Sequence, residues 1–296
     1  MSVLITYNLR SHGRSRNRQD GCRLGFTLVE ITVVLVIIGL LAGAIMAGAT
    51  MIRNSKLLGV INEIKQYTDA TVLFKEKYHY LPGDMPNAES FWGTDPLGCY
   101  RGSLYSSATL TQATCNGNGD GRIDPISEAF RAWQQLANAG MLKGQYSGSC
   151  VDNPRASGSS PCSAGIPYTM MPGVNVPKSS YLDTVGYAMF YQRIFSVISG
   201  DNPALYTPNG NAYWGPISNY RHVIWMGNPW VYFAYGGIVG ADALALDTKM
   251  DDGRPATGNL VNFLYFDSDG CVTSTVAETA TYNLKGNCAL IVLLPF

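Results

Sequence analysis

A run of 22 residues without a charged side chain, from Ile31 to Ile52, constrains the fold of this chain most strongly. Its sequence is ITVVLVIIGLLAGAIMAGATMI. As an α-helix the run would be about 33 Å long, and the hydrocarbon layer of a bilayer is about 30 Å thick. The run therefore predicts a helix that can cross a membrane.

The charges on either side of the run predict its orientation. Five arginines lie within residues 1–25, and Asp20 is the only acidic residue among them. Because basic residues stay on the cytoplasmic side of a membrane helix, we expect the N-terminus in the cytoplasm. Residues 26–296 have 16 basic and 20 acidic side chains. They have no positive excess with which to bind phosphates, so nucleic acid is not an expected partner.

The predicted helix continues beyond the membrane. No proline occurs between Phe26 and Leu81, and Pro82 and Gly83 then end the helical pattern. Past Arg53, apolar and aromatic residues recur at helical spacing. They are Leu57, Val60, Ile61, Ile64, Tyr67, Thr71, Phe74 and Tyr78. This second half is amphipathic, so we expect it to pack across a globular domain.

Glu30 is the only charged residue between Arg23 and Arg53. A lone carboxylate is costly in a bilayer, so it requires a partner and is a candidate functional residue. Cleavage of the chain after Gly25 would create one, the free amino group of Phe26. That amine could pair with Glu30 of the same chain, or with Glu30 of a neighbouring subunit whose helix packs in parallel.

The segment GFTLVEITVVLVIIGLLAG resembles the N-terminal signature of type IV prepilins and of the pseudopilins of type II secretion. The match runs from Gly25 to about Lys56, roughly a tenth of the chain. The resemblance implies cleavage between Gly25 and Phe26 by the prepilin peptidase, an aspartic peptidase of the membrane. It also implies N-methylation of Phe26 and alignment of subunits through Glu30. Many relatives have a proline late in the apolar half, where this chain reads Ala44 to Gly48.

The same resemblance implies a structural subunit of a type IV pilus or pilus-like filament. Its expected partners are further copies, other pilin-like subunits, the peptidase and an inner-membrane assembly platform. The precursor would be a single-pass protein of the bacterial inner membrane, and the product a periplasmic or cell-surface filament. Two alternatives remain, an accessory pseudopilin of type II secretion and a minor pilin that carries an adhesive head.

These considerations divide the chain into three parts. Residues 1–25 are a basic leader that is removed, and residues 26–81 form the long helix, whose residues 26–52 lie in the membrane or the filament core. Residues 82–296 form a periplasmic or extracellular head. Two other interpretations of the apolar run are an ordinary secretory signal, cut near Ala44 or Ala49, and an uncleaved single-span anchor.

The head is expected to be α+β, with the long helix packed on a mostly antiparallel sheet and with loops stapled by disulfides. The predicted strands are His222–Met226, Trp230–Tyr235, Leu260–Asp267 and Ala289–Leu294. Two further helices are predicted, Ile126–Ala139 and Ala241–Met250. Gly144 to Pro177 is rich in Gly, Ser and Pro, which predicts an exposed loop.

Six cysteines follow the apolar run, and none forms a C-x-x-C pair. An even number without metal-ligand spacing favours disulfides in an oxidising compartment over a zinc site. The simplest of about fifteen connectivities joins neighbours in the sequence. It pairs Cys99 with Cys115, Cys150 with Cys162, and Cys271 with Cys288. The alternative is a set of buried free thiols.

The segment from Asn116 to Asp124, NGNGDGRID, resembles the first nine positions of an EF-hand calcium loop. The predicted ligands are Asn116, Asn118, Asp120, Arg122 through its carbonyl, and Asp124. The usual glutamate is missing at the twelfth position, since Ser127 stands there and Glu128 comes one residue later. A calcium ion that orders the loop is one interpretation, and a plain Asx/Gly turn is the other.

The remaining patterns indicate structural roles more than binding or catalytic roles. Aromatic residues between Tyr213 and Tyr235 suit strands of a core better than a sugar-binding platform. The acidic residues Asp247, Asp251 and Asp252 fit a helix end that runs into a turn, and a second cation site is the alternative. The chain contains no G-x-S-x-G, H-E-x-x-H or P-loop motif. We therefore expect no enzymatic activity and no required cofactor.

Overall fold

The structure is a computed structural model that describes residues 26–96, 111–125, 128–149, 170–193, 220–228, 236–262, 270–273 and 279–296. The chain divides into two compact units, of which the first ends at Met51 and the second begins at Ile52.

The longest element is helix α1, Leu28–Tyr78, which has 51 residues. It confirms the continuous helix predicted from the absence of proline. The helix ends where His79 adopts a left-handed φ of 63°, and Pro82 follows three residues later. By length and composition, its apolar N-terminal half can cross a membrane.

The second unit contains a four-stranded sheet with the order β1-β2-β6-β4, in which all neighbours are antiparallel. Its strands are β1 Gly186–Arg193, β2 Tyr220–Gly227, β4 Leu260–Asn262 and β6 Leu290–Leu293. A separate two-stranded sheet pairs β3 Ile238–Val239 with β5 Asn287–Cys288. Strands β2 and β6 confirm two of the predicted strands. Strand β4 confirms the first three residues of the predicted strand Leu260–Asp267. Residues 263–267 and the predicted strand Trp230–Tyr235 lie outside the described residues.

The sheet also contains a strand that the sequence patterns did not predict. Strand β1 pairs with β2 along its whole length, from Gly186 opposite Gly227 to Arg193 opposite Tyr220. Its sequence GYAMFYQR has no clean alternation, because both faces of the central residues are buried.

Three shorter helices complete the fold, α2 Glu89–Trp92, α3 Ala129–Asn138 and α4 Gly240–Met250. Helix α4 agrees with its predicted range within one residue. Helix α3 is shorter than predicted and begins at Ala129, and residues 126 and 127 lie outside the described part. The described portions of the predicted loop, residues 144–149 and 170–177, contain no helix or strand. The expected exposure is wrong for part of them, because Ser147, Asn175 and Val176 are buried, and Val176 belongs to the core.

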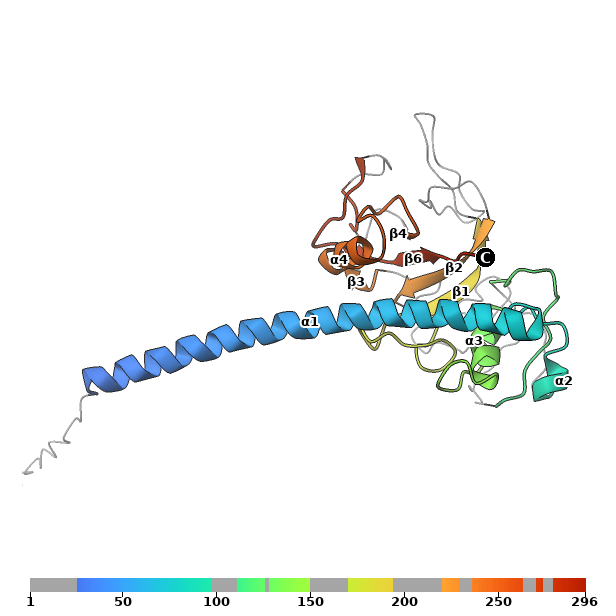
Figure 1. Ribbon diagram of the computed structural model, residues 1–296, viewed down its shortest axis with the longest axis horizontal. Helices are drawn as coiled ribbons and strands as arrows, with labels where there is room; N and C mark the ends of the chain where they lie inside the picture. Colours follow the sequence, from blue (N-terminus) through green and yellow to red (C-terminus); the bar gives the residue numbers. More distant parts are fainter. Residues whose placement is uncertain are drawn as a thin grey trace, which may run out of the picture. The chain divides into compact units, whose positions relative to one another are not determined.

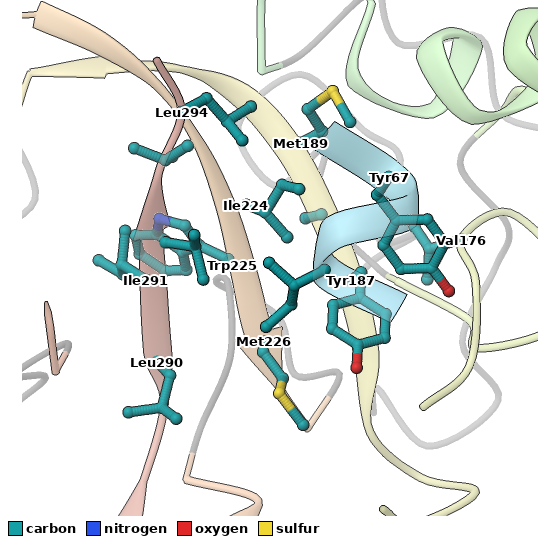
Figure 2. Packing of buried hydrophobic residues seen from close by; sticks show 14 of the residues in the cluster. Tyr67, Val176, Tyr187, Met189, Ile224, Trp225, Met226, Leu290, Ile291 and Leu294 are labelled. Atoms are coloured by element: carbon teal, nitrogen blue, oxygen red, sulfur yellow. The ribbon is translucent and has the colours of Figure 1, made fainter. Parts of the chain in front are cut away.

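The core of the second unit forms where the amphipathic half of α1 lies across the sheet (Figure 1). The Tyr67 ring lies 5.1 Å from that of Trp133 in α3 and 5.0 Å from that of Tyr187 in β1, centroid to centroid. Figure 2 shows Tyr67 and Tyr187 with the side chains of β2 and β6 that continue the cluster, among them Ile224, Met226 and Leu290. The chain is therefore α+β, with a long N-terminal helix and an antiparallel sheet.

Candidate functional site

The candidate site begins at the N-terminal end of α1. Phe26 is 82% exposed, and the helix begins two residues later. Gly25, the residue before the predicted cleavage point, lies outside the described residues. As long as the peptide bond to Gly25 is intact, the nitrogen of Phe26 is an amide and carries no charge.

Thr27 and Glu30 form a reciprocal capping box at this end of the helix. The Thr27 backbone N–H donates to Glu30 Oε2 at 2.8 Å, and the Thr27 hydroxyl donates to the same oxygen at 2.9 Å. The Glu30 N–H donates in return to the Thr27 hydroxyl oxygen at 3.2 Å. Two of the helix's otherwise unpaired N–H groups are satisfied in this way.

The capping box gives Glu30 a local partner that was not among the sequence predictions. The T-x-x-E pattern was visible, since threonine followed three residues later by glutamate is the standard sequence signature of this motif. Its consequence is that one carboxylate oxygen of Glu30 is held at the first turn of the helix. It stays there before any cleavage creates a charged amine.

The remainder of this unit presents apolar side chains to its surroundings. Every large apolar residue from Leu28 to Met51 is exposed. Burial within the helix starts at Leu57 and continues at helical spacing as far as Phe74. An exposed apolar surface of this extent requires lipid or other apolar helices as its neighbours.

A second candidate site is the loop from Asn116 to Asp124, which is anchored by two buried carboxylates. Asp84 accepts the backbone N–H groups of Asp120 at 3.0 Å and Gly121 at 2.9 Å. Glu128 accepts those of Asn118 at 3.0 Å and Asp124 at 2.8 Å. The loop therefore owes its shape to carboxylates that lie outside it.

The loop also packs closely against the backbone around Asp84. The N–H of Gly117 donates to the Met85 carbonyl at 2.8 Å, and that of Gly119 donates to the Asp84 carbonyl at 2.9 Å. A Cβ on Gly117 would lie 2.3 Å from the carbonyl carbon of Asp84, so only glycine fits here.

Three titratable groups at this loop have altered pKa values. Burial raises the pKa of Glu128 to about 7, and burial also raises the pKa of Asp84. Burial lowers the pKa of His222, whose Nε2 accepts the Ile123 N–H at 3.3 Å. Each carboxylate uses both of its oxygens to accept N–H groups of the loop, and His222 Nε2 can accept only while it carries no proton. Ionisation of the two carboxylates is therefore coupled to the anchoring of the loop.

Three of the predicted calcium ligands, Asn116, Asn118 and Asp120, accept hydrogen bonds from the backbone through their side chains. Asn116 Oδ1 accepts the Glu89 N–H at 2.9 Å, and Asn118 Oδ1 accepts the Asp120 N–H at 2.8 Å. Asp120 Oδ1 accepts the Arg122 N–H at 2.9 Å. The bonds of Asn118 and Asp120, each to the N–H two residues later, form the Asx turns of the alternative interpretation. The oxygen atoms of this loop still suit calcium, so calcium binding here stays a prediction.

A third acidic group lies at the end of α4. The carboxylates of Asp247, Asp251 and Asp252 come within 4.8 Å of one another, and no other trio of potential ligand side chains in the described ranges comes so close. Each has partners within the protein. Asp247 accepts the Tyr282 hydroxyl at 2.9 Å and the Gly253 N–H at 3.2 Å, and Asp252 accepts the Arg254 N–H at 2.9 Å. These bonds account for the cluster as a helix end that runs into a turn.

The remaining sequence predictions have mixed outcomes. The disulfide between Cys271 and Cys288 is confirmed, and Cys115 is also disulfide-bonded. Cys99, Cys150 and Cys162 lie outside the described residues. Trp225 is fully buried and packs on Phe190, with ring centroids 5.4 Å apart, which confirms the core interpretation for this residue. Among the other aromatics between Tyr213 and Tyr235, Tyr220 lies in strand β2, and the rest are outside the described residues.

No protein-family model, no curated protein and no solved structure matches this chain.

Proposed function

We propose that this protein is the precursor of a filament subunit of the type IV pilin class. It is held in the membrane by the first half of α1 and assembles through that half after cleavage at Gly25. The proposal covers the pilus and the type II secretion filament alike, because both use the same N-terminal chemistry in the family that the sequence resembles.

The proposal rests on one observation: the first half of α1 combines an exposed apolar surface with a single carboxylate, that of Glu30, which is held in the capping box. The first half of α1 is apolar and exposed, and Glu30 is its only charged side chain before Arg53. A helix that only anchors a protein gains nothing from a carboxylate next to its apolar run, because moving the charge into lipid costs free energy. A bundle of parallel helices has a use for it, because it can bind an amine of an adjacent subunit.

Cleavage would change the chemistry beside Glu30 in a defined way. Hydrolysis of the Gly25–Phe26 bond converts an uncharged amide into an ammonium group one residue before the capping threonine. Because Thr27 binds one carboxylate oxygen of Glu30, the other oxygen is left to accept from that ammonium or from the one on a neighbouring chain. A charge-assisted bond of this kind is stronger than a neutral one, so it favours helix bundling over dispersal in lipid.

The test is mass spectrometry of the N-terminus of the protein isolated from cells that contain a prepilin peptidase. We expect a mature chain that begins with N-methylated Phe26. Gly25→Val is the matched variant, and it should retain the arginine-rich leader. A wild-type chain that begins near Ala44 or Thr50 would identify a secretory signal, and an intact leader would identify a plain anchor.

A further inference from the structure

We infer that the end of the head around Asp242 rests on the surface of the phospholipid bilayer in which the precursor is anchored. The inference rests on the membrane anchoring in the proposed function. It adds a second contact with lipid, made by the globular unit itself.

Arg53 places this end of the head at the level of the lipid headgroups. It is the first charged residue after the apolar run. A cationic side chain at the end of a membrane helix lies among the headgroups. The Arg53 side chain is 51% exposed, and its Nε is paired with Oδ1 of Asp242 in the first turn of α4. The N-terminal turn of α4 therefore lies at the same level.

Two exposed apolar residues are linked to Asp242 through Tyr181. Its Oδ2 accepts the Tyr181 hydroxyl at 2.6 Å, and that hydroxyl oxygen accepts the Val239 N–H at 3.3 Å. Leu182 directly follows Tyr181 in the chain. Leu182 and Val239 are each 44% exposed.

A third exposed apolar residue comes from the loop closed by the Cys271–Cys288 disulfide. The Ala241 N–H donates to the carbonyl of Leu284 at 3.2 Å, and the Gly240 N–H donates to that of Gly286 at 2.8 Å. These bonds hold the loop on the first turn of α4. Leu284 is 53% exposed. We call Leu182, Val239 and Leu284 the apolar patch.

The charges around the apolar patch suit an anionic lipid surface. Lys285 is next to Leu284 and is exposed, and Lys56 is exposed one helical turn after Arg53. Asp183, next to Leu182, is acidic and exposed, and its charge is offset by Lys178 at 3.0 Å. Apolar side chains bordered by cations favour the boundary between anionic headgroups and acyl chains.

The occupant of the patch is therefore lipid, and Leu73 offers a matched control for that assignment. Leu73 is also 53% exposed, but it lies 20 residues beyond Arg53 on the same helix. That spacing corresponds to about 30 Å along the helix axis.

The experiment uses the full chain in vesicles of phosphatidylcholine and phosphatidylglycerol. A photoreactive leucine analogue that carries a diazirine replaces Leu284 in one sample and Leu73 in the other. After illumination, mass spectrometry measures the yield of lipid adducts at each position. We expect a yield at position 284 several times that at position 73.

Two results would overturn the inference while the anchoring stands. One is equal lipid yields at the two positions in protein that floats with the vesicles. The other is an adduct at position 284 to a second copy of the chain in place of lipid, which would make the patch a subunit interface. Protein that leaves the vesicles on alkaline extraction would refute the anchoring, and the inference with it.

Discussion

The side chain of Arg53 pairs with Asp242, 189 residues later in the chain, and thereby ties α1 to the first turn of α4. Asp242 is buried, and its second oxygen accepts the Tyr181 hydroxyl. Burial, followed by this hydrogen bond, raises the pKa of Tyr181 to about 12, so the hydroxyl stays a donor at physiological pH. One carboxylate thus joins the helix, the loop at Tyr181 and α4.

We expect Asp242→Ala to lower the free energy of unfolding by about 2 kcal/mol, because two hydrogen bonds to a buried charge are lost. The measurement is chemical denaturation of the detergent-solubilised protein. Asp183→Ala is the control, since the exposed pair of Asp183 with Lys178 should contribute at most about 0.5 kcal/mol. Equal effects of the two substitutions would show that the Asp242 contacts do not stabilise the fold.

Glu30→Ala should leave membrane insertion and leader cleavage intact but deplete the filament several-fold. The reason is that the variant lacks the carboxylate that we propose binds the freed amine of Phe26. Thr27→Val should cause a smaller loss, because Glu30 remains but is no longer held by the capping hydroxyl. The measurement is the ratio of filament-bound to membrane-bound subunit on immunoblots.

Thr32→Val is the matched control for this pair, since the Thr32 hydroxyl donates to the Val29 carbonyl and not to Glu30. It should assemble as the wild type does. Normal incorporation of Glu30→Ala would contradict the charge-pairing account of assembly.

The raised pKa of Asp247 predicts that the free energy of unfolding falls as the pH rises from about 4 to about 7. Burial raises its pKa from 3.8 to about 7. In this interval the unfolded chain has already released the proton that the folded protein retains. Rising pH therefore favours unfolding, by an amount on the order of 4 kcal/mol for a shift of this size. Asp247→Asn should remove this part of the slope, because asparagine cannot ionise.

The measurement is the free energy of unfolding from pH 4 to pH 8, compared between the wild type and Asp247→Asn. Asp183→Asn provides the control, since its side chain is exposed and should leave the slope unchanged. Parallel curves for the wild type and Asp247→Asn would mean that Asp247 is ionised across the whole interval.

Calcium should raise the melting temperature of chelator-treated protein if the loop from Asn116 to Asp124 holds the ion. At a concentration 100 times the Kd, the gain would be about 2.7 kcal/mol. Asp120→Asn removes one ligand charge, so it should weaken the shift. Identical melting curves for the wild type with calcium and with chelator would leave the Asx turns as the full explanation of this loop.

Short-range patterns of the sequence determined the long helix, α4, and strands β2 and β6. An uninterrupted apolar run, helical spacing and the absence of proline act over neighbouring residues, so they are readable without a fold. The pairing of Cys271 with Cys288 was also predictable, because the two cysteines are close in the chain. The capping role of Thr27 was also predictable from the sequence, since its partner Glu30 is three residues away.

Only the tertiary structure decided which distant groups meet. Strand β1 escaped prediction because its pattern follows from burial on both faces of the sheet, which depends on what packs there. Asp84 contacts its loop across 36 residues and Arg53 contacts Asp242 across 189. Such contacts depend on how the whole chain packs. The physical reason is that local propensity acts along the backbone, whereas a buried carboxylate takes its donors from whatever segment the fold brings beside it.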